Sequence, residues 1–523
     1  MARKYLTLLA TLGFALSAMA FAEENSADLF ADAGEADTGS MQSGNQETDI
    51  PDNARPFTLK LSGSHELAYH APVMESDFNY DGEIKTPALR NDLGIELQDG
   101  NVKLVSNWEL DLLQNQNDQV DEGNNDQYGT WNSLARVRPL ENYISWSPEG
   151  FRLSAGYQIF AWGVADRRNP TDNLNPRDYT VGVNADKIPV LALDAVWYPT
   201  DAISLEAIYI PYEQADRWPE DFKEAITGSS LSALGATDSS VSYESLDFSP
   251  KSAIPGAKIS YRSSVADFSI SYLYDYDQYY TPVISVTAGP IYKIESISLE
   301  RKRIHRFGAD AKTTMGSFGL WFEGAYSLTG NSGSDDWSTR RSKFDYTAGL
   351  DTNFGPNDSY YVNFQLIGSW IPGYNSDYGD DYSLPPTMAN LIDRDYMLEF
   401  YQRSTVDGLG FDNQGYLQGA SINLKFDLLD SLVVPQVTAV YMMPLDYDDS
   451  TTKRLGSLAL NPEFDFMPVD SFHIKIGADL YYAWIKEDGD VKLDDEKDMI
   501  GIFTPSNNVY VKVAYKWNYD LKK

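Results

Sequence analysis

The chain has 523 residues, a formal net charge of −36 and no cysteine. This charge argues against binding of nucleic acid, or of anionic lipid by bulk attraction, and the lack of cysteine excludes disulfides, thiolate metal sites and a lipid-anchoring cysteine. Beyond the start of the chain no segment approaches about 18 consecutive apolar residues, so an α-helical membrane protein is excluded.

The first 22 residues have the pattern of a secretory signal peptide. Arg3 and Lys4 precede the apolar stretch Tyr5–Leu16, which is shorter than the about 20 residues of a membrane helix. Small residues offer cleavage after Ala20 or after Ala22. We therefore expect an exported protein that loses this segment.

Residues 23–56 are rich in Asp, Glu, Gly, Ser and Asn and contain little that can form a core. This composition predicts a disordered, acidic periplasmic tail. The apolar pair within Asp28–Ala31 leaves open a docking peptide or a plug for the rest of the protein.

Eight short turns separate pairs of segments that alternate apolar and polar side chains, and each predicts a β-hairpin. With a first strand near Phe57–Tyr69 and a last strand near Asn508–Trp517, we expect about 18 strands, within a range of about 16 to 20. The expected fold is all-β: a closed, transmembrane antiparallel β-barrel over residues 57–518, with long extracellular loops and a C-terminal extension at residues 519–523. The turns are Gln98–Asn101, Ser147–Gly150, Pro199–Asp201, Ser263–Ser264, Thr313–Gly316, Phe354–Asp358, Asp427–Ser431 and Met467–Asp470.

The last strand has two faces of opposite polarity. Val509, Val511 and Val513 alternate with positions that include Lys512 and Lys516. Because successive strand side chains point to opposite sides, one face suits lipid and the other suits water. Charges of both signs recur on the water-facing side of other strands and are too costly to bury dry. We expect a hydrated lumen, wide enough for a channel, lined by Lys103, Glu109, Arg152, Glu323, Lys475, Asp479 and Lys512.

Aromatic residues recur near both ends of the expected strands. A spacing of about ten to twelve residues along tilted strands separates two girdles by about 25 Å, which matches an outer membrane. The expected girdle tryptophans are Trp146, Trp162, Trp197, Trp370, Trp484 and Trp517.

Nine long loops connect the strands at the end opposite the turns. Within them, Val283–Ile297 alternates well enough to extend a hairpin beyond the membrane, and Leu398–Gln402 is a second candidate for such an extension. The acidic segment Asn115–Asp126 lacks the ordered spacing of a calcium loop, so we expect solvated acidic loops rather than a calcium site. Bridging of these loops to a polyanionic surface by divalent cations is the alternative. The loops are Ala71–Pro87, Gln114–Val137, Gly163–Ile188, Pro211–Ser252, Tyr279–Arg301, Gly330–Arg341, Ile371–Gln414, Pro444–Lys453 and Glu487–Pro505.

The sharpest local pattern begins in the fifth strand and continues into the third loop. It consists of Gly156 and Gln158, then Trp162 and Gly163, Asp166, and finally Asn175, Pro176 and Asp178. The order Gly-x-Gln, Trp-Gly, Asp, Asn-Pro-x-Asp resembles that of a porin-like family of Gram-negative outer-membrane barrels of unassigned function. Some members of that family occur beside exporters of hydrophobic molecules of the resistance-nodulation-division type. The resemblance therefore implies an outer-membrane barrel and points to periplasmic export partners.

The same loop holds the candidates for a constriction. Its Asn-Pro pairs, at Asn169 and Asn175, initiate turns and fix the chain direction twice. In one interpretation, the stiffened loop turns into the lumen, where its charges filter polar solutes. The other leaves the loop on the barrel rim, held by its own ion pairs, with Trp162 in the girdle. The candidates are Asp166, Arg167, Arg168, Asp172, Arg177 and Asp178.

The other groups of polar residues give weaker evidence of function. The chain has four histidines and neither a His-Glu-x-x-His nor a Gly-x-Ser-x-Gly motif, so we expect no enzyme, no metal site and no cofactor. Basic residues at 301–306 and 340–343 either attract anions, such as polysaccharide phosphates, or balance neighbouring acidic loops.

These patterns predict an outer-membrane porin-like channel of a Gram-negative bacterium that passes small polar solutes by passive diffusion. We expect contact with outer-membrane lipid and lipopolysaccharide, handling by the barrel-assembly machinery, and a mild preference for cations or neutral solutes. Two alternatives remain: an outer-membrane partner in export of hydrophobic molecules or glycans, and a surface barrel for adhesion or ligand binding.

Overall fold

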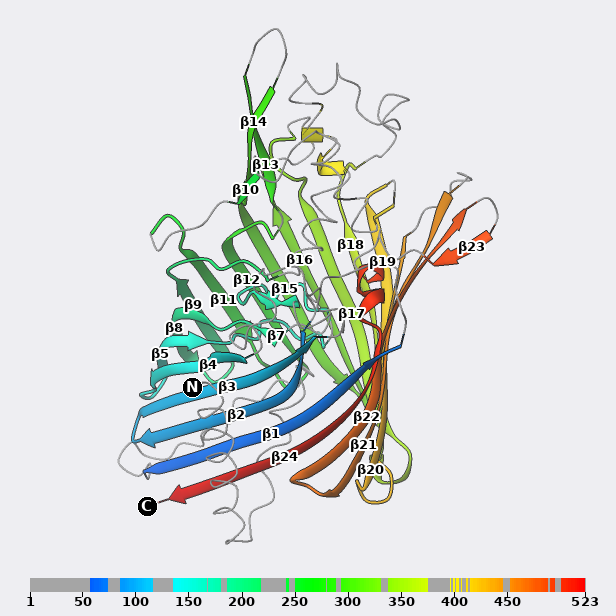
Figure 1. Ribbon diagram of the computed structural model, residues 1–523. Coiled ribbons are helices and arrows are strands. Elements are labelled where there is room, and N and C mark those ends of the chain that lie inside the picture. Colours follow the sequence, from blue (N-terminus) through cyan, green and yellow to red (C-terminus); the bar gives the residue numbers. More distant parts are fainter. Residues whose placement is uncertain are drawn as a thin grey trace, which may run out of the picture.

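A computed structural model of the chain describes residues 57–73, 85–115, 135–166, 168–179, 186–217, 241–243, 250–278, 280–287, 293–330, 337–374, 396, 398–399, 401–403, 406, 411–412, 414–444, 452–487, 490–493 and 500–522. The expected signal peptide, the acidic tail and the segment Asn115–Asp126 beyond its first residue lie outside the described residues. Eighteen antiparallel strands form one closed barrel, which confirms the fold predicted from the sequence (Figure 1).

Each barrel strand pairs with the next one along the chain, and the last pairs with the first. In order around the wall the strands are β1 (Thr58–Pro72), β2 (Lys85–Asp99), β3 (Val102–Asn115), β4 (Ala135–Trp146), β5 (Phe151–Gln158), β8 (Val190–Thr200), β9 (Ile203–Ile210), β11 (Ile254–Tyr261), β12 (Ala266–Tyr276), β15 (Arg303–Met315), β16 (Phe318–Leu328), β17 (Lys343–Phe354), β18 (Tyr360–Trp370), β19 (Tyr416–Phe426), β20 (Val433–Pro444), β21 (Thr452–Val469), β22 (Phe472–Glu487) and β24 (Asn508–Lys522).

The seam between the first and last strands closes the sheet. All 15 residues of β1 have a partner on β24, from Thr58 opposite Lys522 to Pro72 opposite Asn508. The barrel was expected to end at residue 518, but β24 continues to Lys522, because Tyr519 to Lys522 still have partners on β1. Closure leaves no open edge along this seam, which is the condition for a sheet to sit in lipid.

The eight expected tight turns all join neighbouring strands. In the turn between β2 and β3, Gly100 has a φ of 56°, and in the turn between β4 and β5, Gly150 has a φ of 70°. A side chain is strained at such angles, whereas glycine adopts them readily. These glycines therefore allow the chain to reverse within a few residues.

The two faces of the wall differ as the alternation predicts. On β18, Leu366 and Trp370 are exposed on the outside, while Asn363, Gln365 and Ser369 are buried on the inside. On β24, Val509 and Val511 are exposed, while Asn508, Tyr510 and Ala514 are buried. An apolar outer face around a polar inner face is typical of a barrel between lipid and a hydrated interior.

Five of the six expected girdle tryptophans lie on the outer face. Trp146, Trp197 and Trp370 are exposed, and Trp484 and Trp517 are partly exposed. The Trp517 indole lies over Gly63 of β1, and its N–H donates to His65 Nε2 at 3.3 Å. Trp162 is different, because it is buried inside the barrel.

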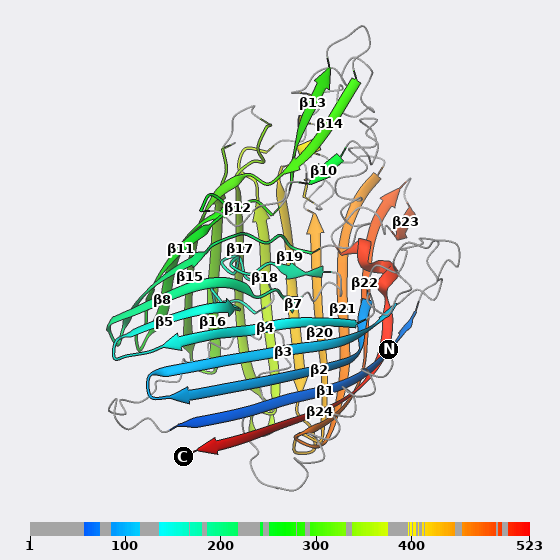
Figure 2. The same cartoon turned by 60° about the vertical axis from the view of Figure 1, so that its left-hand side comes forward.

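Smaller elements lie at the loop end of the barrel. β10 (Val241–Tyr243), β13 (Thr281–Thr287) and β14 (Lys293–Glu300) form a three-stranded sheet that projects well beyond the barrel, as expected for the hairpin predicted at Val283–Ile297 (Figure 2). β23 (Asp490–Leu493) pairs with the end of β22. The expected extension at Leu398–Gln402 is wrong, since the described residues there are helical. Two 3₁₀ helices, η4 (Pro356–Asp358) and η6 (Gly501–Ser506), lie in the connections before β18 and before β24.

We predict that truncation after Asn518 weakens the seam, because it removes the partners of Thr58 to Leu61 on β1. The purified, refolded protein should lose its compact, heat-modifiable form on electrophoresis at a lower temperature than the full chain. Truncation after Lys522 keeps every pair and is the control. Equal melting of both truncations would show that the last residues do not stabilise closure.

Candidate functional site: the third loop inside the barrel

The third loop, residues 159–189 between β5 and β8, begins by folding into the barrel. Phe160, Trp162 and Leu174 are buried in an apolar cluster with inward-facing residues of β8, β9, β11 and β12. The Trp162 indole N–H donates to Glu206 Oε1 at 3.2 Å, and the Lys258 ammonium lies 5.8 Å from the ring centroid. Placing Trp162 in the girdle was therefore wrong: only 3% of its surface is exposed, because it anchors the loop to the inner wall.

Asn175 holds the two ends of the loop together. Its carbonyl oxygen accepts from the Phe160 N–H at 2.7 Å, and its amide nitrogen donates to the carbonyls of Gln158 and Ile188, both at 3.0 Å. The side chain therefore replaces backbone pairing where the chain leaves β5 and returns to β8. These three hydrogen bonds explain why residue 175 is an asparagine. The next residue, Pro176, has no backbone N–H and cannot donate a hydrogen bond there.

Glu323 of β16 anchors the middle of the loop. Its carboxylate accepts hydrogen bonds from the backbone N–H groups of Val164 at 2.8 Å, Ala165 at 3.1 Å and Thr171 at 2.6 Å, and from the Thr171 hydroxyl at 2.8 Å. The side chain is fully buried. A buried carboxylate needs such donors to offset the loss of water, so Glu323 and this part of the loop stabilise each other.

Gly163 lets the loop approach Glu323 this closely. Its φ is 90°, and an added Cβ would lie 2.5 Å from the Thr171 hydroxyl oxygen and closer still to Glu323 and Asn169. Any side chain would push the loop from the carboxylate. The glycine of the Trp-Gly motif is thus required by the docking of the loop.

The next loop residues reach β17 and β18. Arg168 Nη2 donates to Asp345 Oδ1 at 3.2 Å and to Ser369 Oγ at 3.0 Å, and its carbonyl accepts from the Thr347 hydroxyl at 2.8 Å. The Asp166 carboxylate accepts from the Asn363 amide. Two of the constriction candidates therefore lie against one wall of the barrel, whereas Arg167 lies outside the described residues.

The tip of the loop reaches a different wall. β6 (Arg177–Asp178) and β7 (Asp186–Lys187) form a short hairpin inside the outline of the barrel (Figures 1 and 2). Asp178 Oδ2 lies 3.1 Å from Arg136 Nη1, and Asp186 Oδ2 lies 2.9 Å from Arg138 Nη2 and 3.3 Å from Arg90 Nη2. These arginines belong to β2 and β4.

Glu109 and Asp111 of β3 complete this ion-pair cluster. Arg138 Nη2 lies 2.5 Å from Glu109 Oε1, and Arg136 Nη2 lies 2.5 Å from Asp111 Oδ2. Arg217, beyond β9, approaches Asp178 at 3.8 Å. The four arginines of the cluster thus face four carboxylates, so their charges balance.

The remaining loop candidates form an internal pair. Lys187 Nζ lies 2.6 Å from Asp172 Oδ2 and donates to the Phe160 carbonyl at 2.8 Å, while Arg177 Nη2 lies 3.6 Å from Asp172 Oδ2. Asp172 therefore has an ion-pair partner on each strand of the β6–β7 hairpin, Arg177 and Lys187, which lie opposite each other. Here the loop is held by its own ion pairs, as the rim interpretation proposed, although the loop itself lies inside.

The two anchoring walls face each other. Along the barrel, six strands separate β4 from β16 (β5, β8, β9, β11, β12 and β15), and six separate β18 from β2 (β19, β20, β21, β22, β24 and β1). A loop that binds both β2–β4 and β16–β18 must therefore cross the interior. Its backbone and charged side chains therefore lie across the interior of the barrel.

The expected lumen residues outside this loop occur mostly in polar pairs. Lys103 lies 2.9 Å from Glu96, Arg152 lies 2.8 Å from Asp194, and Lys475 lies 3.1 Å from Glu463. The Asn461 amide donates to Asp479 at 2.8 Å, and Lys512 Nζ lies 4.4 Å from the centroid of the Tyr510 ring.

Sequence reasoning missed the partners of the third loop. Arg136 was assigned to a loop, and Arg138, Asp186 and Asp345 were not singled out. One signal was present: Arg136-x-Arg138 and Glu109-x-Asp111 have the same spacing of two, which places matched charges on one face of neighbouring strands. No pattern in the sequence around Asp345 predicts that it pairs with Arg168.

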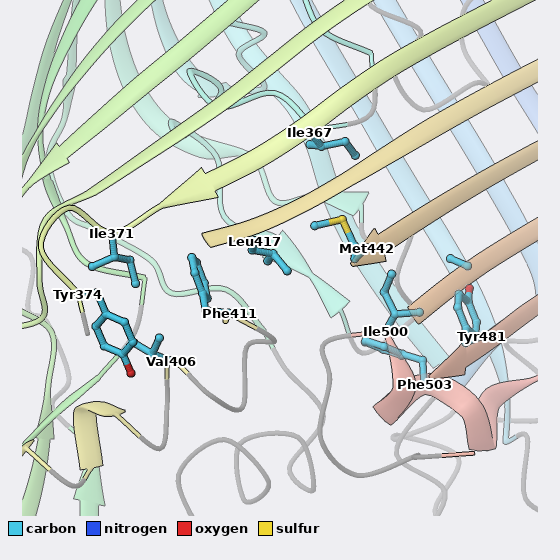
Figure 3. Close-up of a cluster of buried hydrophobic side chains, with 11 residues drawn as sticks. Ile367, Ile371, Tyr374, Val406, Phe411, Leu417, Met442, Tyr481, Ile500 and Phe503 are labelled. Atoms are coloured by element: carbon cyan, nitrogen blue, oxygen red, sulfur yellow. The ribbon is translucent and has the colours of Figure 1, made fainter. Parts of the chain in front are cut away.

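Near the loop end of the barrel, part of the inner wall is covered by apolar packing (Figure 3). Ile367, Leu417 and Met442 of the wall join residues of the later loops, including Phe411 and Phe503. Asn507 fixes η6 here, since its side chain pairs with both the N–H and the carbonyl of Tyr481. This apolar packing therefore narrows the loop end of the barrel from the side opposite strands β5 to β12.

The expected basic clusters mostly balance acidic neighbours. Arg301 pairs with Glu213, Lys302 lies 2.6 Å from Glu300, and Arg306 lies 2.8 Å from Asp275. Among the described residues there is no group of acidic and histidine side chains suited to a metal ion. The described helices include none that is long and apolar enough to cross a membrane.

No protein-family model matches the chain, and no curated protein matches it. Among solved structures it is similar to Pseudomonas aeruginosa OpdK, crystallised with vanillate, at 7% identity over 88% of this chain and 99% of that chain, with a TM-score of 0.44. It is also similar to Wzi of Escherichia coli, a carbohydrate-binding β-barrel involved in capsule assembly, at 9% identity over 87% and 84%, with a TM-score of 0.43.

A third similar structure is the outer-membrane channel DcaP of Acinetobacter baumannii, at 10% identity over 88% of this chain and 96% of that chain, with a TM-score of 0.37. All three TM-scores are below 0.5. The fold therefore rests on the strand pairing of this chain, and its function has to be argued from its own contacts.

We predict that Glu323→Ala releases the middle of the third loop without opening the barrel. Backbone N–H groups of Val164, Ala165 and Thr171 should exchange with solvent about tenfold faster or more, because each loses a charge-assisted hydrogen bond. Hydrogen-exchange mass spectrometry measures this change. Asp310→Ala is the control, since Asp310 lies opposite Glu323 in register but accepts from Ser269 instead. Equal exchange in both variants would remove Glu323 as the anchor.

The tip of the loop should loosen in acid. Burial by itself raises the pKa of the Asp186 carboxyl, but Arg90 and Arg138 outweigh burial and hold the pKa below its ordinary value of 3.8. A lowered pKa means that the carboxylate stabilises the folded arrangement above about pH 4, and that this contribution is lost as the pH falls through the folded pKa.

Hydrogen exchange at Arg177 and Asp178, corrected for intrinsic rates, should therefore increase between about pH 5 and pH 2. Asp186→Asn should show faster exchange already at neutral pH and a weaker dependence on pH. A wild-type profile that Asp186→Asn reproduces in full would exclude this carboxylate as the acid-sensitive group.

Proposed function

We propose that the protein is an outer-membrane porin-like channel that passes small polar solutes by passive diffusion, with the third loop as its filter. One observation carries the proposal: a charged loop crosses the interior of a closed barrel whose outer face is apolar. A wall of this kind suits lipid, and the charges inside require hydration.

The filter consists of backbone and side chains held at both ends. Asp166 and Arg168 lie against β17 and β18, and Asp178 and Asp186 lie against Arg136 and Arg138. Preorganised charges on opposite sides of a passage create a transverse field that orients polar solutes. Because the arginines are balanced by carboxylates, we expect no strong attraction of anions, and neutral solutes or weak cations should pass most readily.

The proposed location in the outer membrane also determines which molecules the protein would contact. The apolar outer face would contact outer-membrane lipid and lipopolysaccharide, and the barrel-assembly machinery would insert the chain. The solute gradient would supply the driving force. Periplasmic export partners remain an implication of the sequence resemblance alone.

Planar-bilayer recording tests the channel and the filter. The wild-type protein should give stepwise currents, and deletion of Asp166–Asp178 should enlarge the single-channel current, because the loop no longer narrows the passage. Deletion of an equally long segment between β18 and β19, residues 376–388, is the control and should change the current less.

The outcomes separate the two claims. A wild-type protein that is folded but silent in the bilayer would contradict the channel. A conducting protein whose current is unchanged by the third-loop deletion would leave the channel intact and remove this loop from the filter role.

A further inference from the structure

A row of aromatic side chains marks one membrane interface on the outer face of the barrel. It runs across six neighbouring strands, from β12 to β19, and each member lies directly opposite the next in register. Phe307 and Trp370 of this row are exposed. Aromatic girdles of this kind lie at the level of the lipid headgroups. The row consists of Tyr272, Phe307, Tyr326, Phe344, Trp370 and Tyr416.

Two basic residues continue the outer face of β15 beyond this row, toward the loops. His305 and Arg303 precede Phe307 at intervals of two, so all three lie on the same face. On the other side of the row, the same face continues with Ala309 and Ala311. His305 is exposed and Arg303 is half-buried, on a strand that pairs with β12 (Figure 2). The outer face therefore changes from apolar to cationic at the level of the headgroups.

Uncharged groups hold Arg303 in place. Its guanidinium carbon lies 3.9 Å from the centroid of the Tyr276 ring and 4.8 Å from that of Tyr274. Nη1 donates to the Tyr274 carbonyl at 3.2 Å, and Nη2 donates to the carbonyl of Lys251, an exposed residue just before β11. A guanidinium has five N–H donors, so three of them are left for a ligand.

His305 adds a further donor on the same face. The Tyr272 hydroxyl lies 2.8 Å from His305 Nδ1, and the Tyr274 ring centroid lies 5.0 Å from that of the imidazole. When Tyr272 donates to Nδ1, the imidazole N–H is on Nε2. Lys251, Arg303 and His305 together are called the outer basic cluster.

The two permanent cations of this cluster differ from their basic neighbours, because the neighbours are paired with acidic side chains. Among the described residues, neither Lys251 nor Arg303 forms an ion pair. Cations without acidic partners on a lipid-facing rim indicate an anionic headgroup as the partner. The paired neighbours are Arg301 with Glu213, Lys302 with Glu300, Arg306 with Asp275 and Arg340 with Asp277.

We propose that the outer basic cluster binds a phosphate group of lipid A, the membrane anchor of lipopolysaccharide. A phosphomonoester carries a charge of about −1.5 to −2 at neutral pH, which matches the two cations Lys251 and Arg303. Its oxygens would accept from these side chains and from His305. The acyl chains would lie on the apolar face on the other side of the aromatic row. The inference rests on the proposed outer-membrane location, with the long loops outside, and assigns the residues that hold the lipid.

Direct binding in detergent tests the cluster independently of conductance. Native mass spectrometry of the refolded protein in dodecyl maltoside, at increasing concentrations of bisphosphorylated lipid A, gives the Kd. Lys251→Gln and Arg303→Gln should each weaken binding about fivefold, and the double variant about 25-fold, because each change removes one cation near the lipid phosphate. Lipid A without its phosphates should bind the wild-type protein as weakly as bisphosphorylated lipid A binds the double variant.

Lys302→Gln is the matched control. It changes the net charge by the same amount next to Arg303, but the Lys302 ammonium already pairs with Glu300 at 2.6 Å. Its substitution should change lipid A binding less than about twofold. Heat-modifiable electrophoresis confirms that each variant is a closed barrel, and Lys251→Gln, on an exposed residue outside the strands, keeps the test decisive if Arg303→Gln does not fold.

The results distinguish this inference from the channel. Equal losses in Lys251→Gln and Lys302→Gln, equal affinity of the wild-type protein for phosphatidylglycerol, or equal lipid A binding by the wild-type protein and the double variant would each overturn the lipid A site. None of these results would alter the bilayer currents expected of a channel. Lipid A binding that depends on Lys251 and Arg303, in a folded protein that carries no current, would support the site and contradict passive diffusion.

Discussion

Pairing of every backbone N–H and C=O within a closed ring is the constraint on which the rest of this structure depends. In lipid an unpaired backbone group has no water to bond, so a sheet can span the membrane only when its first and last strands meet. β1 and β24 meet along the whole of β1. Closure then divides the side chains between two environments, and the alternation of each strand follows from that division.

Closure of the barrel also places charged side chains on its inner face. Charged side chains on the inner face need partners or water, and the third loop supplies many of those partners. Glu323 receives four hydrogen bonds from the loop, and the arginines of β2 and β4 receive its carboxylates. Because these walls are opposed, the contacts that satisfy buried charges also hold the third loop across the interior of the barrel.

The inner wall therefore differs in polarity from one group of strands to the next. The third loop binds where the wall is charged, and an apolar cluster covers part of the loop end. Between them, β18 to β20 keep amide and hydroxyl groups, some of them without partners.

The sequence alone determined the strands, the turns and the two faces, because alternation with a period of two and short turns, most of which contain glycine or aspartate, are local properties. It also identified the third loop by its motif, and it listed Glu323 and Glu109 as lumen residues. Only the tertiary structure decided that the loop lies inside, that Trp162 anchors it, and that Arg168 meets Asp345. Those pairs are 177 residues apart or belong to opposed walls, and only the curvature of the closed sheet brings them together.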